Sequence, residues 1–116
     1  MIKPCTRDWL LQSITAVILI PLFVYSVFTF LTVLSTGGAY ADMIAWVKLP
    51  CVSVTLLLLI CIGFYHGAIG MEVVIDDYIT PEFLRINSIR LINLSALAMA
   101  LVGILSIIEI LFEAPV

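Results

Sequence analysis

The sequence predicts an all-α integral membrane protein, a single membrane-anchor domain over residues 1–116 with three transmembrane helices. The composition, 64% hydrophobic and 11% charged with a mean hydropathy of +1.28, is far too apolar for an ordinary soluble domain. Uncharged runs long enough to cross a bilayer place the spans at approximately 13–34, 49–71 and 90–110. The short remaining segments leave no room for a nucleotide or substrate domain, so we expect no catalysis by this chain alone and no nucleic-acid partner.

The first predicted span lies in a run without charged residues from Trp9 to Ala41. This run is too long, and too poor in small residues at a cleavage site, for a signal peptide, so we expect it to stay in the membrane. Pro21 removes one backbone hydrogen bond inside the run, which predicts a kink near residues 17–21.

The second predicted span follows a helix-breaking segment, Ser35-Thr36-Gly37-Gly38. Tyr40 and Trp46 then supply aromatic side chains that are typical of a membrane interface. Pro50 suits the first turn of the next helix, because its missing N–H would have no partner there in any case.

The third predicted span begins at a strong helix-start signal. Thr80 is expected to be the N-cap, Pro81 the first helical residue, and Glu82 a favourable charge near the positive end of the helix. The uncharged run over residues 91–108 then crosses the membrane within the span 90–110.

Basic residues predict the orientation. Lys3, Arg7, Arg85 and Arg90 fall on one side of a three-span chain and Lys48 on the other. The positive-inside rule therefore places the N-terminus in the cytoplasm or matrix and the C-terminus on the outer side. The expected location is the bacterial cytoplasmic (inner) membrane, or the mitochondrial inner membrane if the chain is organelle-encoded, with membrane lipids as neighbours.

His66, the one histidine of the chain, lies well inside the second span, where an ionisable side chain is costly and suggests a function. It could be a haem ligand, part of a proton relay, or a side chain hydrogen-bonded across a helix interface. In a continuous helix, Asp77 lies on nearly the same face, about 16 Å further along the axis. Gly63, Gly67 and Gly70 form a low-volume surface beside His66 that would admit a flat macrocycle or a partner helix.

The pattern His66-x-x-x-Gly70-Met71 followed by Asp77-Tyr78, between the second and third spans of a short chain, resembles the small hydrophobic membrane anchor of succinate dehydrogenase, which is respiratory complex II. Asp8-Trp9 and Thr15-Ala16 resemble the start of that anchor's first span. The Ser-x-x-His-Arg type motif of the sister cytochrome subunit is absent. The resemblance implies an anchor subunit of succinate:ubiquinone oxidoreductase that holds the flavoprotein and iron–sulfur subunits on the membrane.

The resemblance also implies the site residues. His66 would be an axial ligand of haem b iron, Tyr78 would hydrogen-bond ubiquinone, and Asp77 would support the quinone site. Because the chain has one histidine, a cytochrome b-type membrane subunit would supply the second axial ligand. FAD and iron–sulfur clusters would belong to partner subunits only. Ubiquinone, the substrate, takes up two electrons and two protons, so a phenol donor and a nearby carboxylate suit its reduction.

One position departs from the family pattern. Relatives commonly carry an arginine just before the position of Ile14, where it can meet a haem propionate, and this chain has Ser13. Arg7 lies nearly two turns earlier and could substitute only by extending inward. A purely structural anchor or assembly subunit, without haem or quinone, is therefore the alternative. A small multidrug-type transporter fits less well, since it would need four spans and a carboxylate in its first helix.

Overall fold

The computed structural model describes residues 4–113, and within them it contains four helices and no strand. These are α1 (Pro4–Ser35), α2 (Tyr40–Lys48), α3 (Pro50–Tyr78) and α4 (Glu82–Phe112). Three of them carry apolar segments of 30, 29 and 31 residues, each long enough to cross a membrane. The predicted all-α fold with three spans is confirmed.

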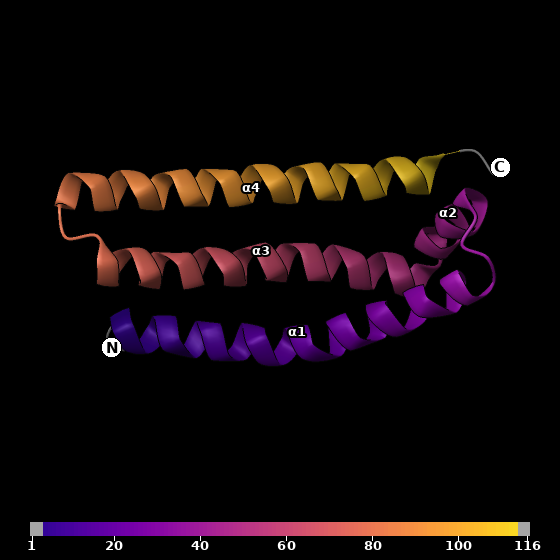
Figure 1. Cartoon of the computed structure of the whole chain (residues 1–116), viewed down its shortest axis with the longest axis horizontal. Helices are drawn as coiled ribbons and strands as arrows, with labels where there is room; N and C mark the ends of the chain where they lie inside the picture. Colours follow the sequence, from indigo (N-terminus) through magenta and orange to yellow (C-terminus); the bar gives the residue numbers. More distant parts are fainter. Residues whose placement is uncertain (1–3, 114–116) are drawn as a thin grey trace.

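The three long helices lie side by side with α3 in the middle (Figure 1). α3 packs against both neighbours, whereas no Cα atom of α1 lies within 8 Å of one in α4 in the described part of the chain. The N-terminus and the α3–α4 connection share one end of the molecule, and α2 and the C-terminus share the other (Figure 1). Which end faces which compartment stays a prediction from the basic residues.

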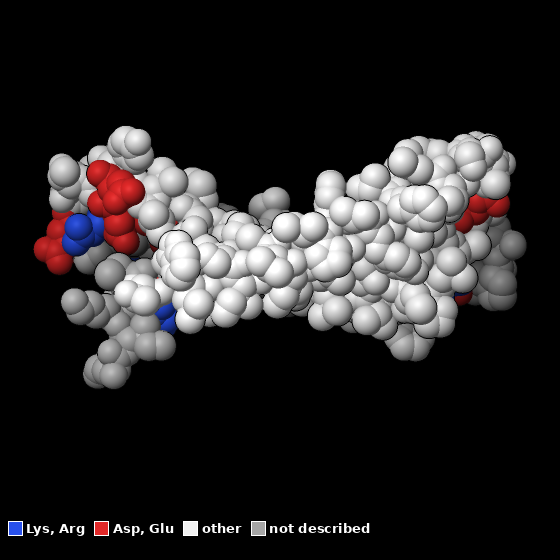
Figure 2. Space-filling view, turned by 90° about the horizontal axis from the view of Figure 1, so that it is seen from below, with Lys and Arg blue, Asp and Glu red and all other residues white. Residues whose placement is uncertain are grey.

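The chain buries little of its own apolar surface. Among the described residues, Val52 is 2% exposed and the other buried hydrophobic residues are four isoleucines, whereas Val17 and Leu91 are 66% and 65% exposed. Charged residues gather at the two ends, and the side seen in Figure 2 is uncharged between them. An apolar surface of this kind suits lipid or other membrane subunits.

α1 continues through Pro21, and its second half runs at an angle to its first half (Figure 1). The missing proline N–H is the physical reason to expect a bend there. The helix ends where Gly37 and Gly38 adopt positive φ angles of +115° and +62°. The N–H of Gly38 donates to the carbonyl of Val33 at 3.2 Å, which satisfies one of the last carbonyls of the helix.

The nine-residue helix α2 was not predicted from the sequence. Its Trp46 ring packs against Phe30 of α1 with centroids 5.5 Å apart, so Trp46 is part of the packing of this end as well as an aromatic near the interface. Tyr40, by contrast, is 68% exposed. Lys48 at the end of α2 donates to the backbone carbonyl of Glu113 at 2.6 Å, which caps the negative end of α4.

The two proline signals had different outcomes. Pro50 begins α3 as predicted, with Leu49 as the N-cap. The predicted start of α4 was wrong by one residue: Pro81, with ψ of 120°, is the N-cap, and no side-chain hydrogen bond caps the start of this helix. Because the backbone of Pro81 is extended and not helical, the first helical residue is Glu82, which does lie in the first turn.

Candidate functional site

α3 is continuous from Pro50 to Tyr78, so it carries all three predicted site residues on one rigid element. The eleven residues from His66 to Asp77 correspond to about three turns and an angular offset of about 20°. The two side chains therefore project from nearly one face of the helix, about 16 Å apart along its axis.

His66 is hydrogen-bonded to the neighbouring helix. Its Nδ1 atom lies 2.7 Å from Oγ1 of Thr15 in α1, and Thr15 is only 7% exposed. The other ring nitrogen, Nε2, makes no hydrogen bond to any residue in the described part of the chain. The interhelical hydrogen bond is thus present, and it occupies only one of the two ring nitrogens.

The glycine surface beside His66 is open. A Cβ atom built on Gly67 or Gly70 would have no neighbouring atom within 4 Å, and one built on Gly63 would only touch Leu19 Cδ2 at 4.0 Å. Gly103 in α4 differs, because its Cβ would meet Ile60 Cδ1 at 3.1 Å. Gly103 therefore serves the packing of α3 on α4, while the glycines near His66 leave space that a flat ring or a partner helix can approach.

Tyr78 and Asp77 lie at the exposed end of α3. Tyr78 is 82% exposed, and no hydrogen bond joins it to Asp77 within residues 4–113. Arg85 of α4 pairs with Asp76 and not with Asp77, since its Nε atom lies 3.8 Å from Oδ1 of Asp76. The described part of the chain therefore presents the Tyr78 side chain at its surface.

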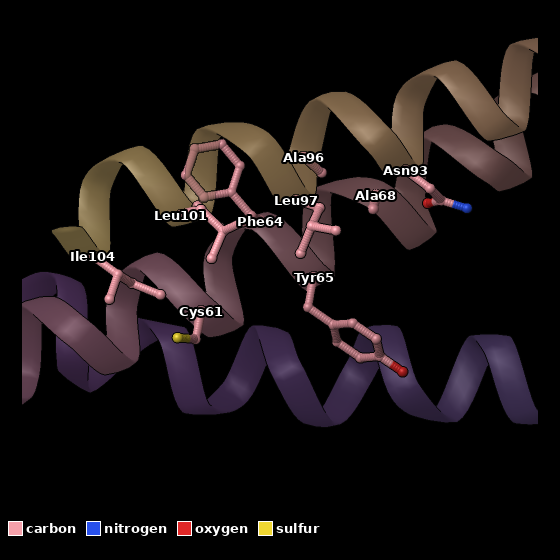
Figure 3. A pocket seen from close by; sticks show the side chains of 10 residues that line it. Cys61, Phe64, Tyr65, Ala68, Asn93, Ala96, Leu97, Leu101 and Ile104 are labelled. Carbon is pink, nitrogen blue, oxygen red and sulfur yellow. The ribbon is translucent and has the colours of Figure 1, made fainter.

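Two pockets lie along α3 away from the predicted site. The first, about 340 Å³, is a largely apolar groove between α3 and α4 with alanines at Ala68, Ala96 and Ala100 in its wall (Figure 3). The second, about 330 Å³, shares Tyr65, Ala68 and Asn93 with the first and reaches α1. His66 and Tyr78 line neither pocket.

Arg7, considered as a replacement for the family's arginine, lines the second pocket. Its Nε atom lies 3.7 Å from Oδ1 of Asp8. Arg7 thus lies at a pocket to which His66 does not contribute, and the structure gives no support to its replacing the arginine missing at Ser13.

At His66, one imidazole nitrogen, Nε2, has no hydrogen-bond partner in the described part of the chain. Among the described residues, no three His, Cys, Asp or Glu side chains gather closely enough to hold a metal. Haem iron needs only axial ligands from protein, for which a single imidazole is a common donor. Thr15, which the sequence indicated only as part of the family resemblance, is the additional residue at this position. Its signal is a hydroxyl within a span, where polar groups often pair across helices, but Ser26 and Thr29 of the same helix carry the same signal without making such a pair.

Comparison with known proteins gives a consistent result. Residues 2–107 match the family described as "Succinate dehydrogenase/Fumarate reductase transmembrane subunit". A protein of Rickettsia bellii is 34% identical over 107 residues, which cover 91% of this chain and 78% of the relative. Relatives from Rickettsia felis (33% over 90 residues; 77% and 72% covered) and Rickettsia conorii (34% over 93 residues; 79% and 72% covered) are also similar. All three carry the name "Succinate dehydrogenase hydrophobic membrane anchor subunit". No solved structure matches the chain.

Proposed function

Because this chain belongs to the family of succinate dehydrogenase/fumarate reductase transmembrane subunits, we propose that it anchors the flavoprotein and iron–sulfur subunits of a succinate:ubiquinone oxidoreductase in the membrane. Its three apolar helices and its exposed apolar surface support this role. The partner subunits then carry FAD and the iron–sulfur clusters and oxidise succinate. The bacterial relatives favour the cytoplasmic membrane of a bacterium, with the α3–α4 connection on the cytoplasmic side.

We also propose that His66 is an axial ligand of haem b shared with a cytochrome b-type membrane subunit. This proposal rests on the different hydrogen bonding of the two ring nitrogens. Nδ1 is hydrogen-bonded to Thr15, while Nε2 has no hydrogen-bond partner among residues 4–113. The open surface at Gly67 and Gly70 would let the macrocycle or the partner's helix approach closely. When bound, haem b supplies a one-electron redox centre inside the membrane.

At the cytoplasmic end, we propose that the Tyr78 hydroxyl donates a hydrogen bond to a carbonyl oxygen of ubiquinone. The exposure of Tyr78 and its place at the end of the helix that carries His66 support this role. Reduction requires two protons and two electrons, and the electrons come from the iron–sulfur subunit. A donor at the developing oxyanion stabilises the reduced form, and Asp77 can pass protons from water or orient the phenol. Partner subunits complete the pocket.

Optical spectroscopy of the purified complex tests the haem assignment and separates it from a purely structural anchor. The wild-type complex is expected to show a reduced α-band of a b-type haem, and His66→Ala should remove or shift it. Tyr65→Phe, one residue away on the pocket-lining face of α3, is the control and should leave the band unchanged. A wild-type complex without haem, or a fully haem-loaded His66→Ala complex with an unchanged spectrum, would contradict the assignment.

A further inference from the structure

The Thr15 hydroxyl lies within hydrogen-bonding distance of three polar atoms. Its Oγ1 atom lies 2.7 Å from the carbonyl oxygen of Leu11, 3.1 Å from that of Gln12 and 2.7 Å from Nδ1 of His66. The residue is 7% exposed, so bulk water does not compete for these positions. A threonine hydroxyl has one proton to donate and two lone pairs with which to accept.

The single proton of the Thr15 hydroxyl determines which atom is the donor in each of these contacts. If the hydroxyl donated to His66, its oxygen would face the Leu11 carbonyl oxygen at 2.7 Å with no proton between two acceptors. If it donates to the Leu11 carbonyl instead, the oxygen accepts from an N–H on His66 Nδ1, and both short contacts are hydrogen bonds. Carbonyl oxygens can only accept, so the second arrangement is the one in which every short contact has its proton.

We propose that Thr15 is a positioning residue that holds His66 as the Nδ1–H tautomer, leaves the Nε2 lone pair free to act as an iron ligand, and lowers the midpoint potential of the haem. This inference rests on the proposed ligation by His66. A histidine that ligates a metal through one nitrogen usually donates its other N–H to a fixed acceptor, which sets the ring orientation and raises its basicity as a ligand.

The local structure suits Thr15 to this task. The hydroxyl's bond to the carbonyl four residues earlier fixes its rotamer within α1, and the β-branched side chain has little other freedom. The bond to His66 then spans 51 residues of sequence and joins two helices, so the ring is held from outside its own helix. A more basic imidazole stabilises ferric relative to ferrous iron, which is why the hydrogen bond should lower the potential.

Thr15→Val and Thr15→Ser in the assembled complex test the inference, with haem per FAD and the haem midpoint potential as the two readouts. Valine keeps the shape and removes the acceptor, so haem affinity should fall about tenfold. The potential should rise, and a tenfold change in the ratio of ferric to ferrous affinity corresponds to about 59 mV. Serine keeps the hydroxyl and should restore both values toward those of the wild type.

Ser26→Ala is the matched control, since Ser26 is a buried hydroxyl of the same helix that bonds only to the Leu22 carbonyl within the described residues. It should leave the potential unchanged. If the valine complex does not assemble, Thr15→Ala removes the hydroxyl with less bulk and gives the same readouts.

Wild-type potential and haem content in the Val or Ala variant would overturn the role of Thr15, as would a Ser variant that shifts as far as Val. Ligation by His66 would survive either result, because His66→Ala tests it separately.

Discussion

His66 and Tyr78 lie on the same helix but differ in exposure and in hydrogen bonding. His66 is partly buried and has a hydrogen-bonding partner 2.7 Å away in α1. Tyr78 is 82% exposed, and its hydroxyl makes no hydrogen bond within residues 4–113. In our proposal, Thr15 orients the His66 ring from within this chain, whereas partner subunits complete the surroundings of Tyr78.

The predicted depth of each residue in the membrane accounts for the difference. A polar side chain within the hydrocarbon has no water to satisfy it, so its partner must come from the protein. A phenol at the end of a span can be solvated while the site is empty, which leaves its hydroxyl available to a substrate. The comparison therefore yields predictions for each end of α3.

Topology gives the largest expected contrast, because its outcome is all-or-none. Reporters fused to the N-terminus and the C-terminus should be active in opposite compartments, with the N-terminus and the α3–α4 connection inside. The structure places the two ends of the chain at opposite ends of the molecule (Figure 1). If both reporters indicated one compartment, the span count would be wrong. The prediction that Tyr78 lies at the cytoplasmic side of the membrane would then lose its support.

Tyr78→Phe should affect quinone chemistry next most strongly. It keeps the ring and removes the donor, so the loss of one oxyanion-type hydrogen bond should cost about 2 to 4 kcal/mol at most in quinone reduction. Steady-state rates of succinate:ubiquinone reduction would measure this. Electron transfer from succinate to an artificial acceptor that bypasses quinone should be unaffected.

Two other results would change the interpretation of Tyr78. An equal loss of both activities would mean that Tyr78 holds the soluble subunits on the membrane. Normal quinone reduction would mean that it is an interfacial aromatic residue without a role in the reaction.

A matched pair of glycine substitutions compares the open surface near His66 with internal packing. Gly103→Leu should destabilise the α3–α4 contact by about 1 to 3 kcal/mol, because a Cβ there already meets Ile60 at 3.1 Å. Gly67→Leu adds bulk where the chain itself has no atom within 4 Å, so it should leave the helix packing intact and lower the haem retained per FAD.

Thermal unfolding and haem content of both glycine variants would measure these effects. Normal haem retention in the Gly67→Leu complex would indicate that lipid covers this surface and that neither haem nor a partner helix does.

Much of the fold could be predicted because the signals are local. Long uncharged runs define the spans, and Pro50 marks the start of α3. Helix α2 was missed because its nine residues lack a strong pattern and are stabilised by contacts such as Trp46 against Phe30, which join distant segments. The start of α4 was misplaced because Thr80 and Pro81 both carry start signals, and only backbone angles decide between them.

The candidate site was predictable only along one helix. The spacing of His66 and Asp77 is a property of α3, and helix geometry transfers it directly to three dimensions. The pairing of His66 with Thr15 depends on how α1 and α3 slide and rotate against each other, which no local pattern specifies. If partner chains complete the surroundings of Tyr78, as proposed, no single sequence can predict them.

The most direct test of the central claim, that His66 offers Nε2 to haem iron, is chemical rescue of a His66→Gly complex by imidazole. Glycine removes the ligand and leaves space for a free imidazole in its place. The reduced α-band should be lost or shifted in the variant and should return toward the wild-type spectrum in a saturable manner as imidazole is added. A His66→Gly complex that retains full haem and the wild-type spectrum before any imidazole is added would contradict the claim.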